Sequence, residues 1–184
     1  NEINAGIEKM QTIATMVASD PFILNWSKNG FDSKDEPLLI EKLKHVVKTN
    51  KLSGASFADK KTAKYWNQDG FLRVLNTEQD AWFYGFKQSK QPFSISIFQE
   101  SENDVKMFVN HQQINGVGLA GLAKSISAMQ ALLNKFRIEQ SGFVFIADDT
   151  GLVKLHRDAN KVAKAQLDSL YGRGIASQLL QNND

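Results

Sequence analysis

Residues 93–123 read "FSISIFQESENDVKMFVNHQQINGVGLAGLA", and this stretch decides the fold. Apolar and polar residues alternate over 93–97 and again over 105–109, with a polar turn between the two runs. Because successive side chains of a strand point to opposite faces, this alternation predicts an antiparallel hairpin. The run rich in glycine and alanine at 116–123 predicts the next strand, although each glycine weakens the packing of a strand.

The composition indicates a globular chain and argues against several classes of function. The 184 residues include 22 Lys and Arg against 20 Asp and Glu, scattered without a basic stripe, which argues against nucleic-acid binding. The absence of cysteine excludes disulfides, thiolate metal sites and cysteine nucleophiles. No run approaches the ~20 apolar residues that span a membrane. The chain starts inside a helical pattern, so we expect it to be an excised piece of a longer protein.

Apolar residues spaced three and four apart predict two helices ahead of the first strand. The first helix runs to about Ser19 and carries one apolar seam, formed by Ile3, Ile7, Met10, Ala14 and Val17. The second helix covers 39–47 and follows "DEPLL", whose acidic residues and proline suit a helix start. Between the two helices we expect a polar connection.

Turn signals divide the rest of the chain into short elements. Strands are predicted near 54–58, 63–66 and 71–75, followed by a short helix with Thr77 as its N-cap. After the three strands of the opening stretch we expect a helix around 126–136, a hairpin and a last amphipathic segment over 167–180. This order predicts an α+β fold with one antiparallel sheet and helices grouped outside it.

Five passages carry a resemblance to a known family through their order. They read "SFADKKTAKYWNQDG", "WFYGF", "PFSISIF", "MFVNHQQINGVGLAGLAKSISAMQALLNKFRI" and "SGFVFIADDTGLVKLH". In this order they resemble the extracytoplasmic Cache sensor domain, a PAS-like fold of PDC type. Such domains occur in bacterial histidine kinases, chemotaxis transducers and membrane-bound diguanylate cyclases. The resemblance spans nearly the whole chain.

The resemblance implies a PAS-like central antiparallel sheet flanked by helices, with a long N-terminal helix. It also implies an N-terminal helical extension at 1–50, a single sensor domain at 51–165 and a C-terminal segment at 166–184 that leads to a transmembrane helix. The chain would then be the periplasmic part of a bacterial inner-membrane receptor. A diguanylate cyclase, a histidine kinase or a chemotaxis transducer would each serve as its output domain.

The function implied is small-molecule sensing, with a ligand bound in the concavity of the sheet and the signal carried by the terminal helices. A homodimer would form through the apolar seam of the N-terminal helix; in the alternative, that seam packs only on its own sheet. A structural dimerisation domain without a ligand and a stand-alone solute-binding protein are the rival functions. Three observations disfavour catalysis, a metal and a cofactor: the histidines are scattered, no nucleophile elbow or nucleotide-binding loop is present, and "DDTG" reads as a turn.

The candidate ligand-binding residues combine aromatic and polar side chains, as small-molecule sites generally do. Trp82, Phe83 and Tyr84 match the aromatic motif that lines the family's pocket, and Phe93 matches the aromatic that faces it; the alternative is that at least two of the four are plain core. The other candidates are Trp66, Lys87, Ser96, Asn110, His111 and Ala123. Alternation places Ser94 and Ser96 on one strand face and Phe93 on the other, and either face fits the pocket. His111 fits either the pocket or the surface.

Two departures from the family bear on the ligand. Members that bind α-amino acids carry an Arg two positions before the Trp and an Asp at the end of the Gly-rich strand, where this chain has Asp80 and Ala123. A carboxylate ligand would lose its bidentate partner, and an ammonium group would lose its counter-charge. We therefore expect that free α-amino acids are not tight ligands.

Overall fold

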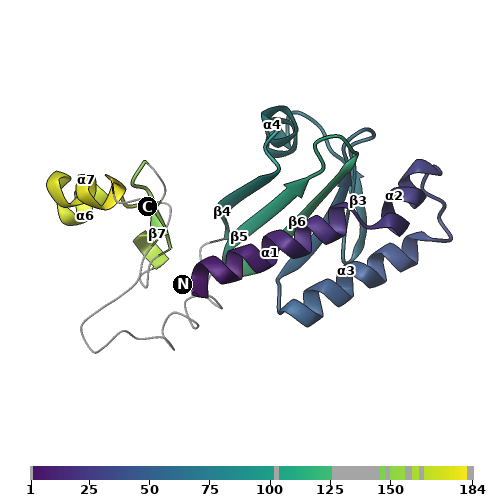
Figure 1. Cartoon of the computed structure of the whole chain (residues 1–184), viewed down its shortest axis with the longest axis horizontal. Coiled ribbons are helices and arrows are strands. Elements are labelled where there is room, and N and C mark those ends of the chain that lie inside the picture. The colour runs from purple at the N-terminus through teal and green to yellow at the C-terminus, as the bar shows by residue number, and fades with distance from the viewer. Residues whose placement is uncertain are drawn as a thin grey trace. The chain divides into compact units, whose positions relative to one another are not determined.

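The computed structural model describes residues 2–101, 104–125, 146–147, 150–155, 159–161 and 164–181. The chain divides into two compact units (Figure 1). The first contains Asn1–Ser96 and Met107–Lys124, and the second contains Ile97–Lys106 and Ser125–Asp184. The candidate site residues all fall within the first unit.

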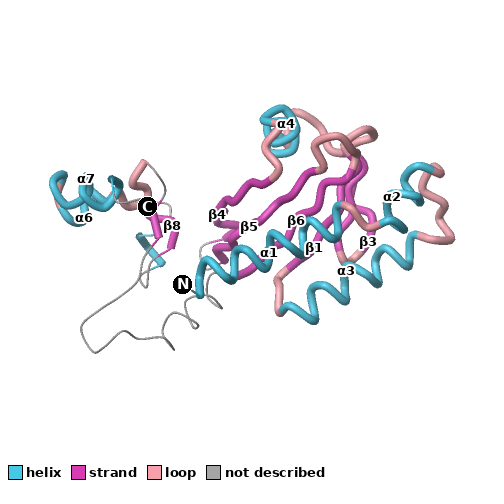
Figure 2. Tube along the Cα trace, viewed as in Figure 1, coloured by secondary structure: helices cyan, strands magenta, loops and turns pink. Residues whose placement is uncertain are grey.

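A six-stranded antiparallel sheet is the centre of the fold (Figure 2). Its strand order is β3-β2-β1-β6-β5-β4, with β1 at Gly54–Asp59, β2 at Lys64–Asn67, β3 at Gly70–Val74, β4 at Phe93–Ser101, β5 at Asp104–Gln112 and β6 at Gly118–Ser125. The two central strands pair antiparallel, from Gly54 opposite Ala123 to Asp59 opposite Gly118. The predicted strands are confirmed, and so is the Gly-Ala-rich run as a strand.

Helices cover both faces of this sheet. The face that carries Phe57 and Asp59 packs against α1 (Glu2–Ala18), α2 (Pro21–Lys28) and α3 (Glu36–Asn50), as shown by the hydrogen bond from Ser27 to Asp59. Ala58, which points the other way, packs with Phe83 and Phe86 of α4 (Ala81–Ser89). We call these the helical face and the α4 face.

The sequence did not predict α2. The first helix ends close to Ser19, as predicted, but Asp20 and Pro21 then begin α2. The Asp20 carboxylate accepts a hydrogen bond from Ile23 N at 3.1 Å, and Pro21 occupies the first turn, where its missing N–H costs nothing. Three helices rather than two therefore precede β1.

The predicted N-cap of the fourth helix is also wrong. The helix begins at Ala81 with Asp80 as its N-cap, not at Thr77. The preceding residues form a turn instead, because the Asn76 side chain accepts hydrogen bonds from the backbone of Glu78 and Gln79.

The seam of the first helix is buried by its own chain. Met10, Ala14 and Val17 are 4%, 0% and 7% exposed, whereas Met16 on another side of α1 is 66% exposed. Their burial within their own chain favours the alternative in which the seam packs only on its own sheet. The side chain of Ile3 lies outside the described residues, and Ile7 is half-buried.

Gly118 explains part of the Gly-Ala-rich strand. A Cβ atom at this position would lie 1.9 Å from the backbone oxygen of Ala18, at the end of α1. No residue except glycine therefore lets α1 lie this close to β6. The helix predicted at 126–136, which we expected to approach this strand, lies outside the described residues.

The second unit contains a small sheet and two short helices. Strand β7 (Ile146–Ala147) pairs antiparallel with β8 (Val153–Leu155), which confirms the last hairpin, and a 3-10 turn follows at Ala159–Lys161. The amphipathic segment forms α6 (Leu167–Tyr171) and α7 (Arg173–Gln181), separated by Gly172 at φ 80°. Asp148 and Asp149 of the predicted turn lie outside the described residues. Among the described helices, none combines the length and hydrophobicity needed to cross a membrane.

Candidate functional site

A polar patch lies in the middle of the α4 face, formed by Ser56, Ser94 and Asn110 around Gly121. Asn110 Nδ2 donates to Ser94 Oγ at 3.4 Å, and Ser56 Oγ donates to the Gly121 carbonyl at 3.3 Å. A Cβ at Gly121 would lie 2.5 Å from Asn110 Oδ1 and 2.8 Å from Ser56 Oγ. The glycine therefore leaves room for two polar side chains on a sheet face that would otherwise be apolar core. Ala123, on the same face by alternation, is buried.

The three motif aromatics of α4, on the same side of the sheet, have different environments. Phe83 is fully buried in a cluster with Ala58, Leu75, Phe86 and Leu119. Tyr84 packs against this cluster, and its hydroxyl donates to the Leu75 carbonyl at 2.9 Å. Trp82 is 40% exposed and meets the Tyr65 ring edge-on at 6.0 Å. Of the three motif aromatics, only Trp82 has substantial free surface.

Asp80 performs a structural task at the start of α4. Its fully buried carboxylate accepts hydrogen bonds from Arg73 Nη2 at 2.6 Å and from Asn76 N at 3.0 Å. The Arg73 hydrogen bond holds the pKa of Asp80 below its usual value, despite the opposing effect of burial, and raises the pKa of Arg73. Asp80 stands where amino-acid-binding family members have an Arg. Its carboxylate is bonded to Arg73 within the protein.

Trp66 lies on the helical face, away from the polar patch. It is 2% exposed, its Nε1 donates to Glu36 Oε1 at 2.7 Å, and its ring meets those of Trp26 and Phe31 at 5.0 and 5.2 Å. It pairs in register with Phe57, which points away from Ala58 and α4. The structure therefore places Trp66 in an aromatic core and not at the polar patch.

The two faces of β4 carry different candidate residues. Ser94 contacts Asn110 on the α4 face, and Ser96, two residues further along, is exposed. Phe93 and His111 alternate with these residues and stack on each other with ring centroids 4.7 Å apart, so both belong to the opposite face. His111 is half-buried, and burial lowers its pKa, which leaves the ring neutral at pH 7.

Gln112 links α4 to the sheet through hydrogen bonds. The sequence did not predict this role. Its buried Nε2 donates to the Phe86 carbonyl at 2.7 Å and to the Gln91 carbonyl at 2.8 Å. Lys87, the residue after Phe86 in α4, donates from Nζ to the Lys60 carbonyl at 2.7 Å. The available signal was the spacing, because Gln112 follows Asn110 by two residues and shares its strand face.

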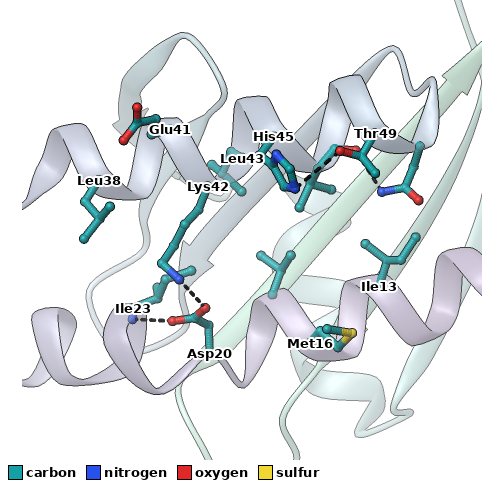
Figure 3. A pocket seen from close by; sticks show the side chains of 13 residues that line it. Ile13, Met16, Asp20, Ile23, Leu38, Glu41, Lys42, Leu43, His45 and Thr49 are labelled. Atoms are coloured by element: carbon teal, nitrogen blue, oxygen red, sulfur yellow. Dashed lines mark hydrogen bonds and ion pairs between the residues drawn. The ribbon is translucent and has the colours of Figure 1, made fainter.

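An apolar groove of about 590 Å³ lies on the other side of the molecule, between α1 and α3 (Figure 3). Ile13, Met16 and Leu38 are among its lining side chains, and Lys42 and Asp20 form an ion pair in it at 2.9 Å. The sequence pattern does not predict this groove, because periodicity shows which side of a helix is apolar and not how far two helices lie apart. In the described part of the chain, no three metal-binding side chains gather at one place.

Comparisons with known proteins identify the fold. No protein-family model matches the sequence. A domain of a protein assigned to the sensory box/GGDEF family of Vibrio parahaemolyticus superposes with a TM-score of 0.72 at 13% identity, over 99% of this chain and 79% of that one. The extracellular domain of a protein assigned as a histidine kinase gives a TM-score of 0.69 at 13% identity, over 99% and 75% of the two chains.

A chemoreceptor gives the third comparison. The ligand-binding domain of the amino-acid chemoreceptor PctC from Pseudomonas aeruginosa, solved in complex with GABA, has a TM-score of 0.65 at 17% identity, over 92% of this chain and 75% of that one. The superpositions cover nearly all of the present chain and establish its fold. At identities this low, the similarity shows the fold alone. The chain thus has the Cache/PDC-like fold shared by extracellular sensor domains of histidine kinases, chemoreceptors and a GGDEF-family protein.

Proposed function

We propose that this chain is the extracytoplasmic sensing domain of a bacterial membrane receptor, and that its ligand binds against the polar patch. The observation that carries the proposal is the arrangement around Gly121, where side-chain hydrogen-bonding groups gather on the sheet face that also packs against the aromatic residues of α4. Convergent polar groups beside apolar surface are characteristic of small-molecule sites. A diguanylate cyclase, histidine kinase or transducer would supply the output.

The ligand we infer is a polar molecule that does not depend on an ionic contact with the patch. Ser56, Ser94 and Asn110 are uncharged, and the carboxylate of Asp80 at the start of α4 is paired with Arg73. Ala123 stands where the amino-acid binders of the family keep their ammonium partner. These residues support the prediction that free α-amino acids are not tight ligands.

A thermal-shift screen tests the function. A ligand that binds the folded state raises the melting temperature with its concentration. For the compound with the largest shift, Asn110→Ala should weaken binding about tenfold, since the loss of a buried hydrogen bond costs on the order of 1.4 kcal/mol. Asn115→Ala, an exposed change in the β5–β6 turn, is the matched control and should leave affinity unchanged.

Calorimetry with the common amino acids completes this test. Micromolar affinity for any of them would contradict the inferred ligand class. A full screen without a saturating compound would instead favour the structural dimerisation domain.

A continuous series of contacts suggests how a ligand would signal. Gln112 ties the end of α4 to β5, Lys60 Nζ donates to the Gln113 carbonyl, and the Gln113 side chain accepts a hydrogen bond from Gly118 N at 3.0 Å. Gly118 in turn lies against the end of α1. We infer that movement of α4 on ligand binding shifts α1 through the β5–β6 turn. Complete switching would require ~5.5 kcal/mol of differential binding, so a weak ligand would bias the receptor only partly.

The homodimer remains part of the proposal, on a different side of the N-terminal helix. Met16 is 66% exposed on α1, whereas the predicted seam residue Met10 is 4% exposed. We therefore expect Met16→Cys to form disulfide-linked dimers of the complete receptor in membranes, and Met10→Cys to form few. Gel electrophoresis without reductant measures the yields. Equal yields at the two positions, or none at Met16, would contradict dimerisation through this side of α1.

A further inference from the structure

Two lysines meet at the end of α4, outside the polar patch. Lys87 Nζ donates to the backbone carbonyl of Lys60 at 2.7 Å. Lys60 follows β1, and its own Nζ donates to the Gln113 carbonyl and, at 3.4 Å, to Gln112 Oε1. These contacts hold both side chains at the junction of α4, the β1–β2 turn and the β5–β6 turn.

The positive charge at this junction is not compensated. Among the described residues, neither Lys60 nor Lys87 forms an ion pair with a carboxylate, in contrast to Lys42, which pairs with Asp20. Asp59, the residue before Lys60, is buried and points to the helical face, where Ser27 bonds to it. Burial, and secondarily the positive charge of Lys87, lower the pKa of Lys60.

The two ammonium groups also keep hydrogen-bonding capacity. Each carries three N–H donors. In the contacts given for the described residues, Lys60 uses two of its donors and Lys87 uses one. Three donors therefore remain for a ligand with several acceptor oxygens. Lys61, exposed in the same turn, adds a further positive charge.

We propose that Lys60 and Lys87 form an oxyanion site that binds a carboxylate or phosphate group of a small molecule. An oxyanion would relieve the repulsion between the two cations and satisfy their free donors by charge-assisted hydrogen bonds. The site depends on its own contacts and does not require a ligand on the polar patch. Because Lys60 also bonds to Gln113, an anion here would act on the β5–β6 turn directly.

The test is an NMR titration of the ¹⁵N-labelled domain with inorganic phosphate and, separately, with succinate at constant ionic strength. We expect saturable shifts at the amides of Lys60 and Lys87. Lys87→Met keeps the length of the side chain and removes its charge, and it should weaken binding about tenfold, as expected for the loss of one charge-assisted hydrogen bond. Lys90→Met, at the next exposed lysine of the same helix end, should change affinity less than about twofold and is the matched control.

The outcomes separate the sources of the anion and the two proposals. Tighter binding of phosphate assigns the site to phosphorylated ligands, and tighter binding of succinate assigns it to carboxylates. Shifts that do not saturate, or equal losses in Lys87→Met and Lys90→Met, would overturn the oxyanion site. Asn110→Ala should leave phosphate binding unchanged, so failure at the polar patch and failure at the lysines are distinguishable.

Discussion

Replacing Trp66 with alanine is expected to lower the free energy of unfolding by about 3–5 kcal/mol, the range for deleting a large aromatic side chain from a core. The side chain is almost fully buried among Trp26, Phe31, Phe57 and Phe71, and its Nε1 is bonded to Glu36. Removal leaves both a cavity and a carboxylate without its donor. Urea unfolding followed by circular dichroism measures the loss.

Trp82→Ala is the matched control for this change. The Trp82 side chain is 40% exposed, so we expect a loss of about 1 kcal/mol or less, close to the range for surface substitutions. If Trp66→Ala were nearly neutral for stability but abolished ligand binding, Trp66 would belong to the site as the sequence predicted, and its assignment to the core would be wrong.

Replacing Gly118 with alanine should lower the free energy of unfolding by about 1–3 kcal/mol, the usual cost of overpacking. The added Cβ would lie 1.9 Å from Ala18 O, which is a backbone atom and not the end of a flexible side chain. Relief therefore requires the end of α1 to move away from β6. Hydrogen exchange of the α1 amides should become faster in this variant, and thermal unfolding reports the stability.

Gly6→Ala, a change within α1 itself, should have the opposite effect on the free energy of unfolding. No atom lies within 4 Å of a Cβ at Gly6, and alanine is the better helix former by about 0.5–1 kcal/mol. This variant should therefore be more stable than the parent chain. A Gly118→Ala variant with unchanged stability and unchanged exchange in α1 would show that the close contact does not constrain the helix.

The strands were predictable because their local pattern agrees with their tertiary environment. Alternation in 93–97 and 105–109 and the turn signals around β1–β3 located these strands well. What covers each face could not be predicted in the same way. Tyr65 and Trp66 are adjacent aromatics in a strand of four residues, and one faces α4 whereas the other faces the helical layer. Their chemistry does not tell which is which.

The helices show the same limit. The seam of α1 was identified correctly as apolar, but periodicity does not say whether the same chain or a second subunit covers it. The α2 helix was missed because it has only eight residues and is held by the Asp20 cap and by packing of Trp26. Resemblance to the family located the aromatic motif, yet the roles of Asp80 and Gln112 depend on hydrogen bonds with Arg73 and with the Phe86 carbonyl that no sequence pattern shows.

The pairing of β1 with β6 has a consequence for how the protein folds. These neighbours in the centre of the sheet are separated by about sixty residues of chain, since Ser56 lies opposite Gly121. Closing so long a loop before any contact forms is slow, as in other domains of high contact order. Until β6 has been synthesised, the β1–β2–β3 meander carries an unpaired edge that favours association with other chains. A polypeptide ending before residue 118 should therefore aggregate, and the complete sheet can form only after its sixth strand has been synthesised.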